Sequence, residues 1–211
     1  MNEPLTRIVV ATANPDKARE IRGVLEAGGL AIELVARPID VAEVEETGET
    51  LLDNARLKAR ALADATGLPS VADDTGLEID PLGGAPGVYS ARYAGADATD
   101  ADNVIRVLDE LTAFRRASRT ARFRTVVVLA SPEGGELVAT GVVEGVIAEA
   151  PTGTAGFGYD PIFKPAGGGG RTFAEMTPSE KDAISHRGRA LRSLAQKMRD
   201  AVPATIRYQE E

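Results

Sequence analysis

The residues of this chain that could do chemistry are carboxylates, lysines and arginines. The 211 residues include one histidine and no cysteine, which leaves out thiol nucleophiles, disulfides, zinc sites with cysteine ligands and metal sites with several histidines. Proton transfer and cation binding therefore fall mainly to Asp and Glu, and anion binding falls to Lys and Arg.

Two acidic segments could hold a divalent cation. Val71-Ala72-Asp73-Asp74-Thr75-Gly76 follows a short apolar run, and paired carboxylates at a strand end are a natural Mg²⁺ site. The alternative for this segment is an Asx-type turn. The second segment, Glu45-Glu46-Thr47-Gly48-Glu49-Thr50, contains adjacent carboxylates that repel each other and must be solvated or neutralised by a cation.

Two lysines stand where they could bind an anion. Thr12-Ala13-Asn14-Pro15-Asp16-Lys17 links a predicted strand to a predicted helix, and the N–H groups of a helix N-terminus attract anions. Plain capping by Asn14 is the alternative, and the glycines of a Walker A loop are missing. Lys58 follows Leu51 by seven residues, at the margin of an apolar helix stripe, where it could either snorkel to solvent or reach into a cleft.

Two further segments could bind a planar base. Gly156-Phe157-Gly158-Tyr159-Asp160-Pro161 places two aromatics and an aspartate on a glycine-rich loop, although an ordinary packed turn would look the same. Ser185 can cap the final helix, and Arg187 extends the buried stripe of that helix toward a cleft. His186 stands beside it, either as a structural residue or as a ligand-binding one, and Lys181 precedes both.

Taken together, these segments suit a nucleoside triphosphate. The chain carries a net charge of −8, which argues against a general nucleic-acid binder. Residues 33–80 contain twelve acidic and four basic residues, so the whole excess lies around the predicted metal site. An acidic protein can hold a polyanion there only if a metal ion and lysines reverse the local field.

The elements that must position these residues alternate between strand and helix. We expect strands at residues 7–12, 31–36, 70–73 and 77–80, a hairpin of residues 121–131 and 136–149, and helices at residues 15–27, 50–66, 99–111 and from 185 onward. The last helix should bury Leu191, Leu194, Ala195, Met198 and Val202. This order predicts an α/β protein with a mixed sheet, in one domain over residues 1–211.

Two features of the chain bear on its location and its surface. Residues 1–4 show no basic start followed by an apolar run, and the apolar stretches are far shorter than the roughly 20 residues that span a bilayer, so we expect a cytoplasmic protein without a membrane segment. The four glycines at 167–170 predict a flexible surface loop.

The sequence closely resembles the inosine/xanthosine triphosphate diphosphatases, which are pyrophosphatases for non-standard purine nucleoside triphosphates. The resemblance covers nearly the whole chain and rests on five blocks in the family's order: TANPDK (12–17), EETGETLLDNARLKA (45–59), ADDTGLEIDPLGGAPGVYSARYAG (72–95), GFGYDPIF (156–163) and EKDAISHRG (180–188). The family often has serine where Thr75 stands, and threonine keeps the hydroxyl.

The resemblance implies an elongated, twisted mixed sheet flanked by helices, with two lobes, a central active-site cleft and a homodimer. It implies the Mg²⁺-dependent hydrolysis of ITP, dITP and XTP to the monophosphate and pyrophosphate, with no nucleic-acid or membrane partner. It further implies the following roles: metal ligands Glu46 and Asp74; general base Asp74, supported by Asp73; phosphate binding by Thr12, Asn14 and Lys17; substrate contacts from Lys58 and Thr75; and a base pocket of Phe157, Gly158, Tyr159, Asp160, Lys181, His186 and Arg187.

Base selection follows from the same assignment. Hypoxanthine and xanthine present an acceptor oxygen at the 6-position, whereas adenine presents a donor amine. Donors from His186 or Arg187 would reward the oxygen and oppose adenine. The alternatives are a related pyrophosphatase for another modified or pyrimidine triphosphate, and a nucleotide-binding regulator without turnover.

Overall fold

A mixed β-sheet forms the centre of the molecule. The computed structural model describes residues 6–114 and 118–201, so the predicted burial of Val202 lies outside the described residues. Within them the sheet has seven strands: β1 (Thr6–Val10), β2 (Ile32–Ala36), β3 (Ser70–Ile79), β4 (Pro86–Gly87), β5 (Thr120–Ala130), β6 (Glu136–Ile147) and β7 (Phe163–Pro165).

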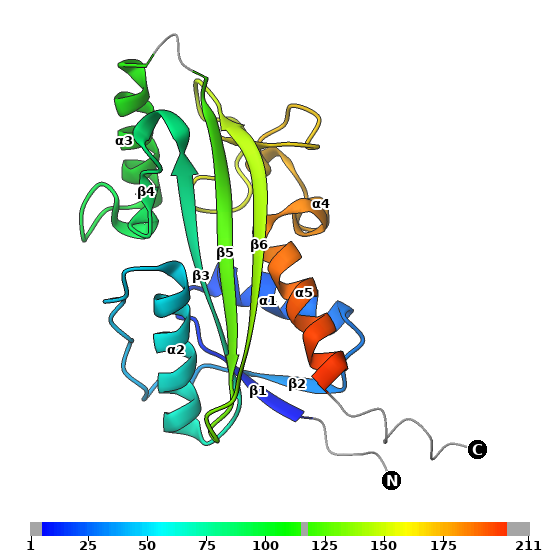
Figure 1. Cartoon of the computed structure of the whole chain (residues 1–211). Helices are drawn as coiled ribbons and strands as arrows, with labels where there is room; N and C mark the ends of the chain where they lie inside the picture. Colours follow the sequence, from blue (N-terminus) through cyan, green and yellow to red (C-terminus); the bar gives the residue numbers. More distant parts are fainter. Residues whose placement is uncertain (1–5, 115–117, 202–211) are drawn as a thin grey trace.

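The strand order is β2-β1-β3-β5-β6-β7, with β4 paired to the far half of β3. The pairs β1–β2 and β1–β3 are parallel, and all others are antiparallel. The predicted hairpin is confirmed as β5–β6, which runs the length of the molecule (Figure 1). This arrangement confirms the predicted α/β fold with a twisted mixed sheet.

Helices cover the sheet on both faces. The described helices are α1 (Pro15–Ala27), α2 (Leu51–Thr66), α3 (Asp100–Thr112), α4 (Pro178–Ile184) and α5 (His186–Ala201), with 3₁₀ turns η1 (Asp80–Leu82), η2 (Ser90–Arg92) and η3 (Phe173–Glu175). The predicted cap at Asn14 is confirmed, and the structure also shows a cap at Thr50 before α2 and a Thr99–Asp102 capping box before α3. The sequence analysis did not predict β4, β7 or α4.

Three apolar cores divide the molecule into two lobes. In the first lobe, α1 and α5 pack on one face of the sheet around Ile21, Leu25 and Leu191, and α2 packs on the other. The second lobe contains α3, β4 and β7, and its core includes Leu77 and Phe163. Figure 1 shows the long β3, β5 and β6 strands joining the two lobes, with α2 and α3 at opposite ends.

One predicted break in the sheet is wrong. Residues 70–73 and 77–80 were expected as separate short strands, but β3 runs without interruption from Ser70 to Ile79. All of its residues through Ile79 pair with β5, so backbone hydrogen bonds hold the polar middle of the strand extended. Asp73 and Asp74 therefore lie within a strand and not at its end.

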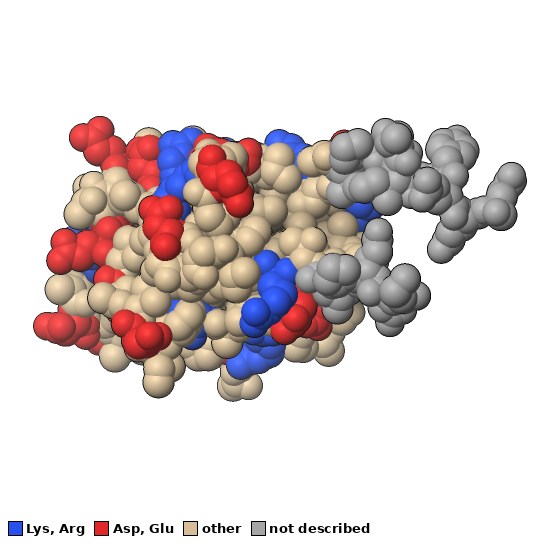
Figure 2. Space-filling view, turned by 90° about the horizontal axis from the view of Figure 1, so that it is seen from below, with Lys and Arg blue, Asp and Glu red and all other residues tan. Residues whose placement is uncertain are grey.

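The described surface carries charged patches and one glycine-rich turn. On the face seen from below in Figure 2, many of the acidic side chains lie toward one end, others lie beside Lys and Arg side chains, and the Lys and Arg side chains form separate patches. Residues 167–170 form a turn after β7 with three of its four positions exposed. None of the helices in the described residues is long and apolar enough to cross a membrane.

Candidate active site

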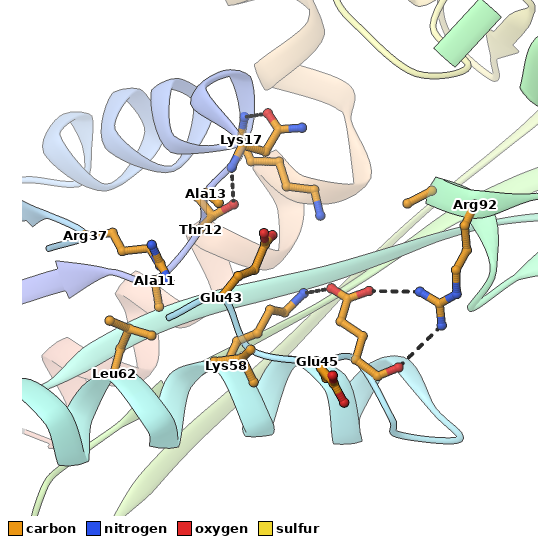
Figure 3. Close-up of a pocket in the computed structure, with 14 residues that line it drawn as sticks. Ala11, Thr12, Ala13, Lys17, Arg37, Glu43, Glu45, Lys58, Leu62 and Arg92 are labelled. Carbon is orange, nitrogen blue, oxygen red and sulfur yellow. Dashed lines mark hydrogen bonds and ion pairs between the residues drawn. The ribbon is translucent and has the colours of Figure 1, made fainter. Parts of the chain in front are cut away.

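The turn between β1 and α1 is built by its own capping bonds. Asn14 Oδ1 accepts from the backbone N–H groups of Asp16 at 2.9 Å and Lys17 at 3.1 Å, and the N–H of Asn14 donates to Thr12 Oγ1 at 3.2 Å. The capping interpretation is therefore confirmed. It also fixes the start of α1 so that the side chain of Lys17 points into the cavity drawn in Figure 3.

Lys58 reaches into the same cavity and joins two carboxylates. Its Nζ lies 2.6 Å from Glu46 Oε1 and 3.1 Å from Asp74 Oδ1, and its side chain is 13% exposed. The snorkelling alternative is therefore wrong, because the ammonium turns inward. Asn54 supports the arrangement: its amide approaches Asp74 at 3.4 Å, and its oxygen accepts from the N–H of Gly48 at 2.8 Å.

The two carboxylates at Lys58 respond differently to burial. Burial raises the pKa of Asp74, and Lys58 and Lys17 only partly oppose this effect. Glu46 is less buried, and Lys58 overcomes its desolvation, so the pKa of Glu46 lies below its usual value. Within the acidic segment, Glu46 is thus neutralised by cations of the protein itself, whereas Glu45 and Glu49 are exposed to solvent.

Asp73 lies on the opposite face of β3 from Asp74. Its Oδ2 accepts from Arg187 Nε at 3.0 Å and from the hydroxyl of Thr75 at 3.2 Å, with Lys17 Nζ at 3.7 Å. Burial disfavours its charge, but Lys17 and Arg187 outweigh that effect and hold the pKa of Asp73 well below its usual value. The expected pair of carboxylates on one metal is therefore not seen: only Asp74 faces Glu46.

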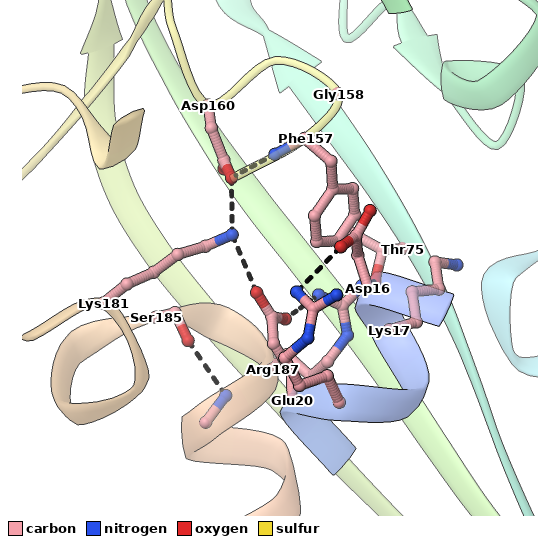
Figure 4. A network of polar contacts seen from close by, with 12 residues as sticks. Asp16, Lys17, Glu20, Thr75, Phe157, Gly158, Asp160, Lys181, Ser185 and Arg187 are labelled. Atoms are coloured by element: carbon pink, nitrogen blue, oxygen red, sulfur yellow. Dashed lines mark hydrogen bonds and ion pairs between the residues drawn. The ribbon is translucent and has the colours of Figure 1, made fainter. Parts of the chain in front are cut away.

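A buried network links α1, α4 and α5 (Figure 4). Glu20 pairs with Arg187 and accepts from Lys181 Nζ at 2.8 Å, and Lys181 also lies 2.5 Å from Asp160. The three guanidinium nitrogens of Arg187 are engaged by Asp73, Glu20 and Thr75. The sequence analysis missed Glu20, although its position one turn after Lys17 on a buried helix face was a signal.

The loop of residues 156–160 closes over this network. Asp160 Oδ2 accepts from the N–H of Phe157 at 3.0 Å, and Lys181 Nζ lies 4.6 Å from the centre of the Phe157 ring. Gly156 has a φ of +75°, and a Cβ there would overlap with the carboxylate of Asp160. Tyr159 points into the second-lobe core and donates from its hydroxyl to Ser90 O at 2.8 Å.

His186 lies at the floor of the cavity beside this loop. Its ring stacks on Phe123 with centroids 4.5 Å apart, and its Nδ1 is buried without a hydrogen-bond partner. Burial and the nearby Arg187 and Lys181 lower the pKa of His186 well below its ordinary value, so the ring is neutral. Gly141 allows this placement, because a Cβ there would overlap with the carbonyl of His186.

The structure brings the predicted site residues into two adjoining cavities. One has a volume of about 510 Å³, and the predicted residues that line it are Thr12, Asn14, Lys17, Glu46 and Lys58. The predicted residues that line the other are Asn14, Lys17, Thr75, Phe157, Gly158, Tyr159, Asp160, Lys181, His186 and Arg187. Asn14 and Lys17 belong to both, whereas the predicted catalytic residues Asp73 and Asp74 line neither cavity and contact the lining residues Lys17 and Lys58 from β3.

Arg92 also lines the first cavity and was not predicted. Its guanidinium lies 3.5 Å from Glu46 Oε2 and 3.4 Å from Glu46 O, so it reaches this residue from η2. The sequence around it, Val88-Tyr89-Ser90-Ala91-Arg92-Tyr93, carries no charge pattern that would mark it as a cavity residue. Only the fold places it beside a residue 46 positions away in the sequence.

The donor set near Lys58 fits a magnesium ion bound together with a phosphate. Glu46 and Asp74 converge on one ammonium position, which a divalent cation could take. In the described residues no three His, Asp or Glu side chains are grouped to hold a metal alone. Mg²⁺ commonly binds through one or two carboxylates plus substrate phosphates and water, so two protein ligands suffice.

The fold and these cavities define an α/β protein with an interlobe cleft in which lysines, arginines and carboxylates face one another. A family model described as the Ham1 family matches residues 8–197, and the chain belongs to this family. The dITP/XTP pyrophosphatase of Streptomyces avermitilis is 47% identical, over 93% of this chain and 98% of that protein. The dITP/XTP pyrophosphatase of Yersinia pseudotuberculosis is 48% identical, over 93% and 100%.

Solved structures agree with this assignment. A HAM1 protein from Coxiella burnetii is 44% identical and superimposes with a TM-score of 0.84, covering 93% of this chain and 100% of that one. The Ham1 protein of Staphylococcus aureus is 35% identical with a TM-score of 0.80, covering 92% and 99%. Both confirm the fold that the sequence predicted.

Proposed function

We propose that this protein hydrolyses the non-standard purine triphosphates ITP, dITP and XTP to the monophosphate and pyrophosphate. The observation that carries the proposal is the convergence of Glu46 and Asp74 on Lys58, next to the capped turn that bears Lys17. The names of the curated relatives support the same substrate class. We further propose that the enzyme depends on Mg²⁺, works as a homodimer and acts in the cytoplasm, where it would remove damaged nucleotides.

The first cavity is proposed to bind the triphosphate. Thr12, Asn14 and Lys17 would hold phosphate oxygens at the start of α1, where free N–H groups and the helix dipole favour anions. Lys58 would shift from its two carboxylates to the phosphates. Glu46 and Asp74 would hold Mg²⁺, which supplies positive charge at the phosphate oxygens when it is bound.

Asp74 is proposed to be the general base. The water oxygen attacks the α-phosphorus, Asp74 takes a proton from that water, and the bond from the α-phosphorus to the bridging oxygen breaks. Negative charge then develops on the leaving pyrophosphate, where Lys17 and Lys58 can stabilise it. Asp73 would act from the other face of β3 by holding Lys17 and Arg187 in place.

The second cavity is proposed to bind the base. Phe157 offers a ring to stack on the purine, Gly158 and Asp160 shape the loop, and Tyr159 anchors it to the second lobe. His186 is proposed to present a ring N–H to the 6-oxo group, because its ring lines this cavity. Arg187 would orient Thr75 and Asp73, since its nitrogens are already engaged.

A triphosphate panel tests this proposal. The enzyme with Mg²⁺ is incubated with ITP, dITP, XTP, ATP, GTP and pyrimidine triphosphates, and pyrophosphate and orthophosphate are measured separately. We expect pyrophosphate from the first three substrates and slow turnover of the standard ones. Direct release of orthophosphate would overturn attack at the α-phosphorus, and tight binding without turnover would indicate a regulator.

A further inference from the structure

Arg92 is held by the second lobe. It ends η2, which is fixed from two sides: Ser90 Oγ accepts from the N–H of Leu77 at 2.9 Å, and Asn103 donates to Ala91 O at 3.1 Å. Tyr159 adds a third bond, from its hydroxyl to Ser90 O. The backbone that carries Arg92 is therefore rigidly attached to β3 and α3.

The side chain of Arg92 crosses the cleft to the first lobe. It meets Glu46, which belongs to the segment before α2, and its guanidinium lies 5.4 Å from the centre of the Tyr89 ring. Lys58 contacts Oε1 of the Glu46 carboxylate and Arg92 contacts Oε2, and Figure 3 shows the side chains of Lys58 and Arg92 approaching from different elements around the cavity. The contacts of Arg92 with Glu46 are long, at 3.5 and 3.4 Å, and its side chain is 35% exposed. An ion pair this long and this exposed contributes little to stability, so breaking it costs little free energy.

We propose that Arg92 is a phosphate-binding residue that leaves Glu46 and binds the two terminal phosphates of the substrate. This inference rests on the proposed function and extends it to a cation supplied by the opposite lobe. Because its contacts with Glu46 are long and its side chain is partly exposed, phosphates can displace that carboxylate from the guanidinium with or without a metal ion, and Arg92 lines the cavity in which they would bind. Its planar fork then fits two phosphate oxygens.

The other cations that line this cavity already have partners in the protein. Lys58 is shared between two carboxylates, and Lys17 lies 3.7 Å from Asp73 on the far side of β3. Arg37 donates to the carbonyls of Val41 and Ala42, so its guanidinium is already engaged by the backbone close to it in the chain. Arg92 is the cation that approaches from the second lobe, and binding through it would draw the lobes together over the phosphates.

The test compares Arg92→Ala and Arg92→Lys with Arg122→Ala. Arg122 is a matched control, since it pairs on the outer surface of the second lobe with Asp80 at 2.9 Å and Glu144 at 3.1 Å. Calorimetry measures the affinity for inorganic pyrophosphate and for IMP, each with Mg²⁺ and in EDTA. We expect Arg92→Ala to weaken pyrophosphate binding by about tenfold or more in both conditions, with IMP affinity unchanged. The Arg92→Lys variant should recover part of the lost pyrophosphate affinity, and the Arg122→Ala variant should bind pyrophosphate and IMP with wild-type affinity.

Each other outcome would overturn the inference. A pyrophosphate loss that vanishes in EDTA would mean that Arg92 acts only by orienting Glu46. An equal loss for IMP and pyrophosphate would mean a general disturbance of the cleft, and an unchanged pyrophosphate affinity would remove Arg92 from phosphate binding. Pyrophosphate binding is measured without turnover, so failure of the proposed function shows separately, as a wild type that hydrolyses none of the triphosphates.

Discussion

Asp73 and Asp74 are adjacent in the chain, yet their carboxylates lie on opposite faces of β3. Asp73 meets Arg187 and Lys17 on the face covered by α1 and α5, and Asp74 meets Lys58 on the face covered by α2. Alternation of side chains along a strand produces this separation. The two carboxylates therefore have different roles: Asp73 is held in a buried ion-pair network, and Asp74 shares the ammonium of Lys58 with Glu46.

Asp74→Asn should abolish turnover while the protein stays folded. The amide keeps the shape of the side chain and its contact with Asn54, but it cannot accept a proton from water. We expect kcat to fall by about 100-fold or more, as for the loss of a general base. Turnover of ITP and urea unfolding measure the two effects. Near-normal activity would exclude Asp74 as the base.

Asp73→Asn should instead destabilise the fold. Arg187 is 2% exposed, and the substitution leaves its charge with only Glu20 as an anionic partner. Breaking a buried ion pair by removing one partner costs about 3 kcal/mol or more. The free energy of unfolding from urea titration checks this value, with Asp74→Asn as the neighbouring control. Equal stability of the two variants would contradict the division between the faces of β3.

The stability of the wild type should decline at low pH in a way that Asp73→Asn does not share. The pKa of Asp73 in the folded protein lies below its unfolded value of about 3.9, because Lys17 and Arg187 outweigh its desolvation. The stabilisation is thus fully present above about pH 4 and is lost as the pH falls through the folded pKa. Unfolding titrations from pH 7 to pH 3 should show a shallower decline for the variant.

Glu20→Gln should loosen the base cavity more than the phosphate cavity. Glu20 holds both Lys181 and Arg187, and Lys181 in turn holds Asp160 and the ring of Phe157. We expect a higher KM for ITP with little change in the affinity for inorganic pyrophosphate. Steady-state kinetics and calorimetry measure the two quantities. Glu26→Gln on the same helix is the matched control, because Glu26 is exposed.

The sequence was sufficient to predict those helices and strands that depend on residues close together in the chain. The cap at Asn14, the apolar stripe of α2 and the valine-rich hairpin each depend on residues within one segment. The continuity of β3 was not predictable in this way, since Asp-Asp-Thr-Gly has low strand propensity and only the pairing with β5 and the cations around it keep it extended. Tertiary context overrode the local preference.

The parts of the candidate site that escaped prediction depend on distant contacts. Glu20 and Arg187 are 167 residues apart, and Arg92 meets Glu46 only because β3 and η2 set one lobe against the other. Charge type alone could not reveal which carboxylate each arginine meets. The resemblance to a known family predicted which residues lie in the cleft. The structure adds which of these side chains already pair with other side chains of the protein.

His186→Ala should relax the preference for ITP over ATP. The ring stacks on Phe123 and lines the base cavity, so a ring N–H facing the 6-position would donate to a 6-oxo group but would meet the N–H of an adenine amine. We expect the ratio of kcat/KM for ITP to that for ATP to fall about tenfold or more, which corresponds to the loss of one buried hydrogen bond. His186→Phe is the companion variant, because it keeps an aromatic ring against Phe123 without the donor. Because the pKa of His186 is far below 6.5, the wild-type ratio should also stay constant from pH 6 to pH 8. An unchanged ratio in both variants would remove His186 from base selection and leave the loop around Phe157 as the source of specificity.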